Sequence, residues 1–117
     1  MLTLFEQAIV MHLIGDWILQ NHWMAQNKPH LTHPAAWIHS GIHTLLQALV
    51  LGWYGGLVMG ALHMLIDTRQ LLNWWRRVFR MTTDGPTALH VSIWTDQVLH
   101  VLCIAAWVQF AAPLFQP

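Results

Sequence analysis

The stretch of sequence that decides the fold is residues 29–66, PHLTHPAAWIHSGIHTLLQALVLGWYGGLVMGALHMLI, which contains no Asp, Glu, Lys or Arg. About 20 apolar residues are enough for a helix to cross the hydrocarbon core of a bilayer. Pro34 suits the first turn of a helix, and the GWYGG sequence at residues 52–56 is typical of a tight turn. We therefore expect two membrane-spanning helices here, over residues 34–51 and 57–72.

The rest of the chain has the composition of a membrane protein. Only 9% of its 117 residues are charged and 56% are hydrophobic, whereas a soluble domain carries about 25% charged residues. Two further apolar segments lie at residues 2–20 and 87–112. We therefore expect one all-α domain over residues 1–117, an integral membrane protein built as a bundle of four antiparallel transmembrane helices.

The basic residues of the chain lie in or next to two links between these spans. Residues 21–29 are expected to form a polar loop, and residues 73–80, with three Arg beside two Trp, are expected to form a short amphipathic helix at the headgroup level between spans three and four. The positive-inside rule makes this side cytoplasmic, which leaves both termini and the 52–56 turn outside. The five basic residues of the chain are Lys28, Arg69, Arg76, Arg77 and Arg80.

Charge and cysteine content exclude several classes of protein. The formal net charge is zero, so the extended basic surface of a nucleic-acid-binding protein is missing. Cys103, the only cysteine, lies in an apolar run and is expected to be a small buried hydrophobic residue. The N-terminus lacks the basic region and the cleavage site of a removable signal peptide, so we expect the first helix to stay in the protein.

One chemical pattern recurs in all four expected spans, namely a pair of His or Asp side chains spaced four residues apart. This spacing places both side chains on one helix face, one turn apart. Because the spans alternate in direction, all four pairs lie toward the cytoplasmic loops and can converge in one layer. The eight residues are His12, Asp16, His39, His43, His63, Asp67, Asp96 and His100.

Inside a membrane, the negative charges of the three aspartates of this set need to be neutralised, since burying an unpaired charge costs a prohibitive amount of free energy. Five imidazoles and three carboxylates suit two divalent metal ions, with zinc favoured and iron or manganese as alternatives, because calcium and magnesium prefer oxygen ligands. Four-helix bundles hold two metals through such inward-facing pairs. The simpler alternative is a set of interhelical polar clamps without a metal.

The motifs His12-x3-Asp16-Trp17-x-Leu19-Gln20, Met24-Ala25-x2-Lys28, His39-x3-His43, His63-x2-Ile66-Asp67 and Asp96-Gln97-x2-His100 cover nearly the whole chain. In this combination the sequence resembles the bacterial membrane family called domain of unknown function 3307. That family is similar in its His and Asp pattern to membrane-bound metal-dependent hydrolases. The resemblance implies a bacterial inner-membrane protein and adds Gln20, Lys28 and Gln97 to the site. Arg69 stands near the position of a lysine that often follows the His63-x2-Ile66-Asp67 motif in the family.

Several roles are open for these added residues. Gln20 and Gln97 could hydrogen-bond a ligating carboxylate or a substrate, or could cap helix ends. Lys28 could bind an anionic headgroup, although a lysine at a helix end usually extends its ammonium toward the interface.

The function favoured by the sequence is metal-dependent hydrolysis of an amphiphilic substrate, a lipid-linked phosphate or ester, at the cytoplasmic interface. Asp96 and Asp16 are the candidate catalytic carboxylates, because a carboxylate beside two metals can carry the proton of the attacking water. The chain has no Gly-x-Ser-x-Gly element, so covalent serine catalysis is unsupported. The alternatives are a metal-ion transporter or sensor and a His-rich di-iron redox enzyme acting on lipid. The expected partners are the lipid bilayer and this substrate. Association with further copies of the same chain, in a homo-oligomer, is another candidate.

Overall fold

The structure is a computed structural model that describes residues 1–115. Over these residues it contains helices and turns and no strand, which confirms the predicted all-α class. The elements are α1 (Leu4–Leu13), the π-helix η1 (Ile14–Ile18), α2 (His22–Asn27), α3 (Pro34–Asp67), α4 (Gln70–Val78), α5 (Ala88–Ala106), the π-helix η2 (Trp107–Ala111) and the 3-10 helix η3 (Ala112–Leu114).

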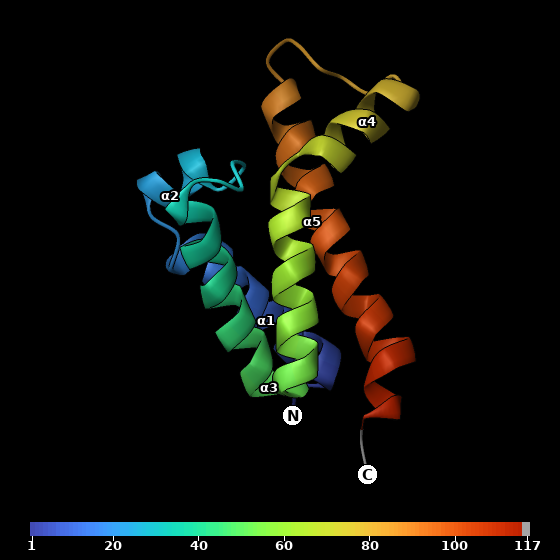
Figure 1. The fold of residues 1–117 in the computed structure, drawn as a ribbon. Helices are drawn as coiled ribbons and strands as arrows, with labels where there is room; N and C mark the ends of the chain where they lie inside the picture. Colours follow the sequence, from blue (N-terminus) through green and yellow to red (C-terminus); the bar gives the residue numbers. More distant parts are fainter. Residues whose placement is uncertain (116–117) are drawn as a thin grey trace.

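The long helix α3 consists of two antiparallel arms, residues 34–51 and 53–67, that reverse direction at Gly52 (Figure 1). Gly52 has φ 78° and ψ 174°, a backbone conformation that is essentially restricted to glycine. The chain therefore reverses at Gly52, the first residue of the predicted 52–56 turn, whereas Gly56 already lies in the second arm. A Cβ atom on Gly56 would lie 2.7 Å from the carbonyl oxygen of Thr44 in the first arm. Because Gly56 has no side chain, the two arms can approach closely.

Four helical segments run alternately up and down the molecule, namely α1, the two arms of α3, and α5 (Figure 1). A small apolar cluster of Ala8, Met59 and Ile104 joins α1, the second arm and α5. The start of α1 and the Gly52 reversal lie at one end of the molecule, and α2 and α4 lie at the other (Figure 1). The loops that contain the basic residues therefore share one end.

Within residues 1–115, two helical runs are long and apolar enough to cross a membrane, Pro34–Asp67 and Ala88–Leu114, where the sequence predicts four spans. The first predicted span is shorter than expected, because α1 has 10 residues and η1 has 5. At 1.5 Å per residue these rise about 22 Å, less than the roughly 30 Å of a hydrocarbon core. The second and third predicted spans are the two arms of the single helix α3. The four-span transmembrane bundle stays a prediction.

Two boundaries differ from those expected. The third segment ends at Asp67 and not near residue 72, because Arg69 adopts a left-handed conformation with φ 65° that separates α3 from α4. α4 then forms the short helix expected between the third and fourth segments, and its location at a lipid interface stays a prediction. The expected polar loop at residues 21–29 contains the helix α2, because the side chain of Asn21 accepts a hydrogen bond from the backbone of Met24 at 2.9 Å.

Polar side chains fill the interior and large apolar side chains cover the outside. His12, His39 and His43 are at most 2% exposed, whereas Leu49 is 78% and Trp94 68% exposed. Soluble monomers rarely expose extended apolar surfaces. This distribution, together with the two long apolar helices, indicates association with a membrane.

The reversal at Gly52 provides a test of the hairpin. Gly52→Ala should lower the free energy of unfolding by about 1–3 kcal/mol, because alanine is strained in this backbone conformation. Gly41→Ala is the matched control, since a Cβ atom there meets nothing within 4 Å and alanine is the better helix former. Thermal unfolding in detergent should show a lower Tm for the first variant only. Equal Tm values for both variants would contradict the proposed importance of this turn.

Candidate metal centre

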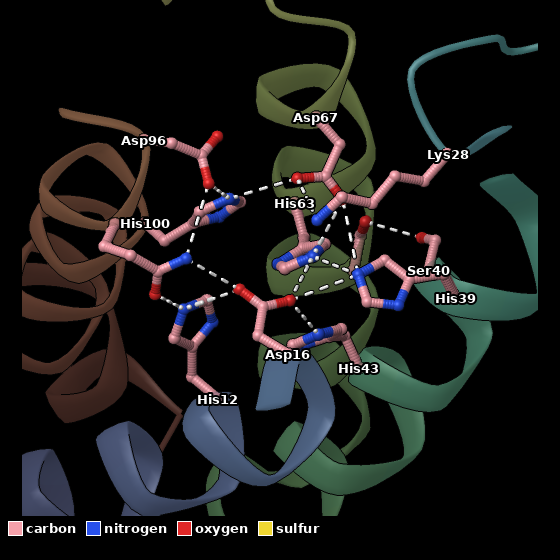
Figure 2. A network of polar contacts seen from close by, with 12 residues as sticks. His12, Asp16, Lys28, His39, Ser40, His43, His63, Asp67, Asp96 and His100 are labelled. Carbon is pink, nitrogen blue, oxygen red and sulfur yellow. Dashed lines mark hydrogen bonds and ion pairs between the residues drawn. The ribbon is translucent and has the colours of Figure 1, made fainter. Parts of the chain in front are cut away.

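The eight paired His and Asp residues come together in one buried cluster between α1, η1, both arms of α3, and α5 (Figure 2). Each of the four helical segments contributes one pair, and every member is 8% exposed or less. All five histidines approach the aspartates through the same ring nitrogen, Nε2. In both arms of α3 the pair lies toward the end that adjoins α2 or α4.

One half of the cluster surrounds the carboxylate of Asp16. Its Oδ1 atom lies 3.0 Å from His43 Nε2, 3.2 Å from His39 Nε2 and 3.4 Å from His63 Nε2. The Nε2 atoms of His39 and His63 are 3.0 Å apart. Three imidazole nitrogens and one carboxylate oxygen thus face a common centre.

The other half surrounds the carboxylate of Asp67. Its Oδ2 atom lies 3.0 Å from His63 Nε2 and 3.4 Å from His39 Nε2, and its Oδ1 atom lies 3.3 Å from His100 Nε2. Asp96 Oδ2 approaches the same His100 nitrogen at 3.6 Å. Since His63 and His39 contact both Asp16 and Asp67, the two halves form one continuous set of donors.

These distances fit a coordinated metal ion. Donors bound tetrahedrally at about 2.0–2.1 Å from a zinc ion lie about 3.3–3.4 Å from one another, close to the 3.0–3.4 Å separations around Asp16. Both carboxylate oxygens of Asp67 and the Nε2 atom of His100 are buried without a hydrogen bond. Buried polar atoms nearly always have a partner, and a cation would supply one. The residues of the cluster could therefore hold a metal ion.

Local backbone structure directs Asp16 into the cluster. Asp16 lies in the single π-helical turn η1, in which the N–H of Leu19 donates to the carbonyl of Ile14 at 2.9 Å. Such widened turns are frequent at functional sites. The neighbouring Gly15 lies against the ring of His43, and a Cβ atom there would approach that ring to 2.5 Å. A side chain at position 15 would displace His43.

Gln97 and Lys28, which only the resemblance assigned to the site, both contact it. Gln97 Nε2 donates to Asp16 Oδ2 at 3.0 Å, and Gln97 Oε1 lies 2.9 Å from His12 Nε2. Lys28 Nζ lies 3.6 Å from Asp67 Oδ1, and its side chain is 12% exposed. The ammonium thus points into the molecule, although a lysine at a helix end usually extends its ammonium toward the interface.

Among the described residues, Gln20 and Arg69 form no hydrogen bond or ion pair with the eight residues but line a cavity of about 190 Å³ beside them. Arg69 Nη1 donates to Ser92 Oγ at 3.1 Å, and Gln20 Oε1 is buried without a partner. Asp16, Asp96, Lys28 and Gln97 line the same cavity. All four residues proposed around the metal ligands therefore lie at one side of the cluster.

Sequence reasoning did not select three buried polar residues. Ser40 Oγ donates to the carbonyl of Gly60 at 2.7 Å, and Gln47 Nε2 donates to that of Ala8 at 2.9 Å. Ser92 accepts the hydrogen bond from Arg69. The helical spacing could have found two of them, because Gln47 follows His43 by four residues and Ser92 precedes Asp96 by four. Ser40 has no such signal.

The four remaining histidines are not members of the cluster, as expected. His33 caps α3, since its Nδ1 accepts a hydrogen bond from the backbone N–H of Ala35 at 3.1 Å. The other three, which are exposed, are His22, His30 and His90.

Comparison with known proteins addresses the family resemblance. The family model described as "Protein of unknown function (DUF3307)" matches residues 4–116, a range that includes the complete cluster. No curated protein and no solved structure matches the chain. The resemblance carried by the five motifs is thus confirmed, and the chain belongs to the DUF3307 family of proteins of unknown function.

Proposed function

We propose that this protein is an intramembrane di-metal hydrolase that acts on an amphiphilic substrate, a lipid-linked phosphate or ester. The observation that carries the proposal is the buried set of five Nε2 atoms and three carboxylates, whose separations around Asp16 are 3.0–3.4 Å. Zinc suits a donor set rich in imidazole, and iron or manganese are the alternatives.

The charges of the cluster support bound cations. Asp16, Asp67 and Asp96 are buried together, and the one ammonium near them, within the described residues, belongs to Lys28 at 3.6 Å from Asp67. Repulsion between three carboxylates in a poorly solvated interior is costly. Two divalent ions would offset it and leave a surplus of positive charge that favours an anionic substrate.

Two neighbouring divalent ions polarise a phosphoryl or carbonyl oxygen and activate water for attack. Among the three carboxylates, Asp96 is best placed to accept the proton of the attacking water. It lines the cavity of about 190 Å³, and its contact to an imidazole, 3.6 Å from His100, is longer than those of Asp16. Asp16 also lines the cavity, but three histidines surround it, which favours a role as a ligand. Gln97 donates a hydrogen bond to Asp16 Oδ2 and so holds this carboxylate in place.

The proposed setting is the inner membrane of a bacterium. We propose that α1 with η1, the two arms of α3, and α5 each cross the bilayer, with local thinning around the short α1 segment. The basic residues of α2 and α4 would then lie in the cytoplasm, and the Gly52 reversal and both termini outside. Exposed Trp23, Trp74 and Trp75 at the basic end suit the headgroup region.

A catalyst is favoured over a metal transporter because the ligand groups lie in a single layer. A transport pathway needs polar groups at successive depths. Towards the opposite end of the molecule, the cluster is followed by the apolar contacts of Ala8, Met59 and Ile104.

Metal content is the first test. The purified protein should contain about two divalent ions per chain, and His43→Ala should lower both metal content and Tm, because folding and binding are coupled through these ligands. His90→Ala, an exposed histidine outside the cluster, is the matched control. Elemental analysis and thermal unfolding with and without chelator provide the measurements. Unchanged metal content in alanine variants of all eight residues would favour polar clamps in place of a metal site.

The second test separates catalysis from metal binding. Asp96→Asn should retain at least part of the metal yet reduce turnover of a lipid-linked phosphate or ester by about 10²-fold or more, as expected for loss of a general base. Asp84→Asn, at an exposed turn, should leave turnover unchanged. The assay is a lipid-substrate screen with wild-type protein, together with metal uptake into proteoliposomes. Metal uptake without hydrolysis of any substrate would replace the hydrolase with a carrier.

The third test concerns orientation. In a Cys103→Ser background, a cysteine in place of Tyr54, which is 69% exposed, should react with an impermeant maleimide in intact cells. A cysteine in place of Thr83, exposed at the opposite end, should react only after lysis. The reverse pattern would place the site on the outer side of the membrane.

A further inference from the structure

The cavity beside the cluster has the features of an anion-binding site. It has a volume of about 190 Å³, and its walls include the cationic side chains of Lys28 and Arg69 and the amides of Gln20 and Gln97. Asp16 and Asp96, two members of the cluster, line it as well. A group bound here would meet the proposed metal site directly.

Two separate elements hold the cations in position. Lys28 is the C-cap of α2, where its N–H donates to the carbonyl of the buried Met24 at 2.9 Å. Its ammonium lies 3.6 Å from Asp67 Oδ1, which is too long for a hydrogen bond. The ammonium is thus close enough to interact electrostatically with the cluster and can still donate a hydrogen bond to a ligand.

Arg69 lies on another wall of the cavity. Its left-handed backbone begins α4, and its Nη1 atom donates to Ser92 on α5 at 3.1 Å. A guanidinium has five N–H donors, so this hydrogen bond fixes the side chain and leaves donors for a ligand. Buried Gln20 Oε1 has no partner and can accept a hydrogen bond from a ligand hydroxyl.

We propose that this cavity binds the phosphate group of the substrate through Lys28 and Arg69, so that the substrate is a phosphorylated amphiphile and not a neutral ester. The proposal rests on the hydrolase function above. Phosphate has the charge and the acceptor oxygens to engage an ammonium and a guanidinium together. A neutral ester carries no negative charge to pair with Lys28 or Arg69.

The lining of the cavity agrees with a headgroup. Its walls are polar apart from Trp17, Ala25 and Ile93, which suits a polar group better than acyl chains. Trp17, which lines the cavity, is 61% exposed. The apolar part of the substrate would therefore pass Trp17 and stay in the surrounding lipid.

The carboxylates of Asp16 and Asp96 make phosphate binding dependent on metal. Without cations they would repel an anion in the same cavity. We therefore expect phosphate to bind the metal-loaded protein more tightly than the chelated protein.

Binding measurements with inorganic phosphate provide the test. In metal-loaded protein, Lys28→Met and Arg69→Met should each weaken binding about tenfold or more, as expected for loss of a charge-assisted hydrogen bond. Lys28→Arg should retain most of the affinity. Arg77→Met, which removes an exposed arginine of α4 outside the cavity, is the matched control. Equal phosphate affinity in all four variants would overturn the proposal.

Two short-chain lipids test whether the cavity binds the phosphate of a lipid headgroup. Dihexanoyl phosphatidate should compete with inorganic phosphate for the cavity, whereas dihexanoylglycerol should not. Competition by dihexanoylglycerol, or binding of inorganic phosphate without competition by the phosphatidate, would overturn the phosphorylated amphiphile.

Metal analysis of the same samples separates this proposal from the hydrolase function. Normal metal content with phosphate binding that ignores Lys28 and Arg69 overturns the phosphate site and leaves the metal site intact. Phosphate binding that depends on both residues in a protein without metal supports the phosphate site and overturns the di-metal function.

Discussion

Burial of three carboxylates among five imidazoles is the constraint on which the rest of this structure depends. Each helical segment must turn its His or Asp pair inward, so its large apolar side chains are left to cover the outside. The same constraint explains the position of Lys28, whose ammonium lies beside Asp67 and not at the surface. A molecule organised in this way suits an apolar environment on its outside, and its buried carboxylates favour positive charge within.

The helices are held together mainly by close backbone approach and by polar contacts. Gly56 brings the two arms of α3 within contact, and the Ser40 hydroxyl bonds across them to the carbonyl of Gly60. Gln47 joins the first arm to α1 through the carbonyl of Ala8. Small residues and interhelical hydrogen bonds are the usual basis of helix association in lipid, where the hydrophobic effect does not drive helices together.

Much of the site was predictable because a spacing of four residues fixes which side chains share a helix face. The four His and Asp pairs, the chain reversal near residues 52–56 and the helix after α3 all follow from such local rules. The π-turn at Asp16 and the left-handed Arg69 depend on tertiary packing and have no comparable local signal. Gln97 contacts His12 and Asp16 across 85 and 81 residues of sequence, which only the folded arrangement reveals. The helix α2 lies where the sequence predicts a polar loop, although Asn21 is a favourable N-cap residue that could have indicated a helix.

The hairpin at Gly52 has a consequence for the order in which the protein assembles. His39 and His63 are separated by 24 residues, whereas Gln97 and Asp16 are separated by 81. Closing the longer loop costs about 1 kcal/mol more in chain entropy, so contacts within the hairpin form at lower cost. During synthesis, α3 is complete before α5 has been made. Half of the donor set can therefore gather from one contiguous segment, and α5, arriving last, closes the site around whatever that segment already holds.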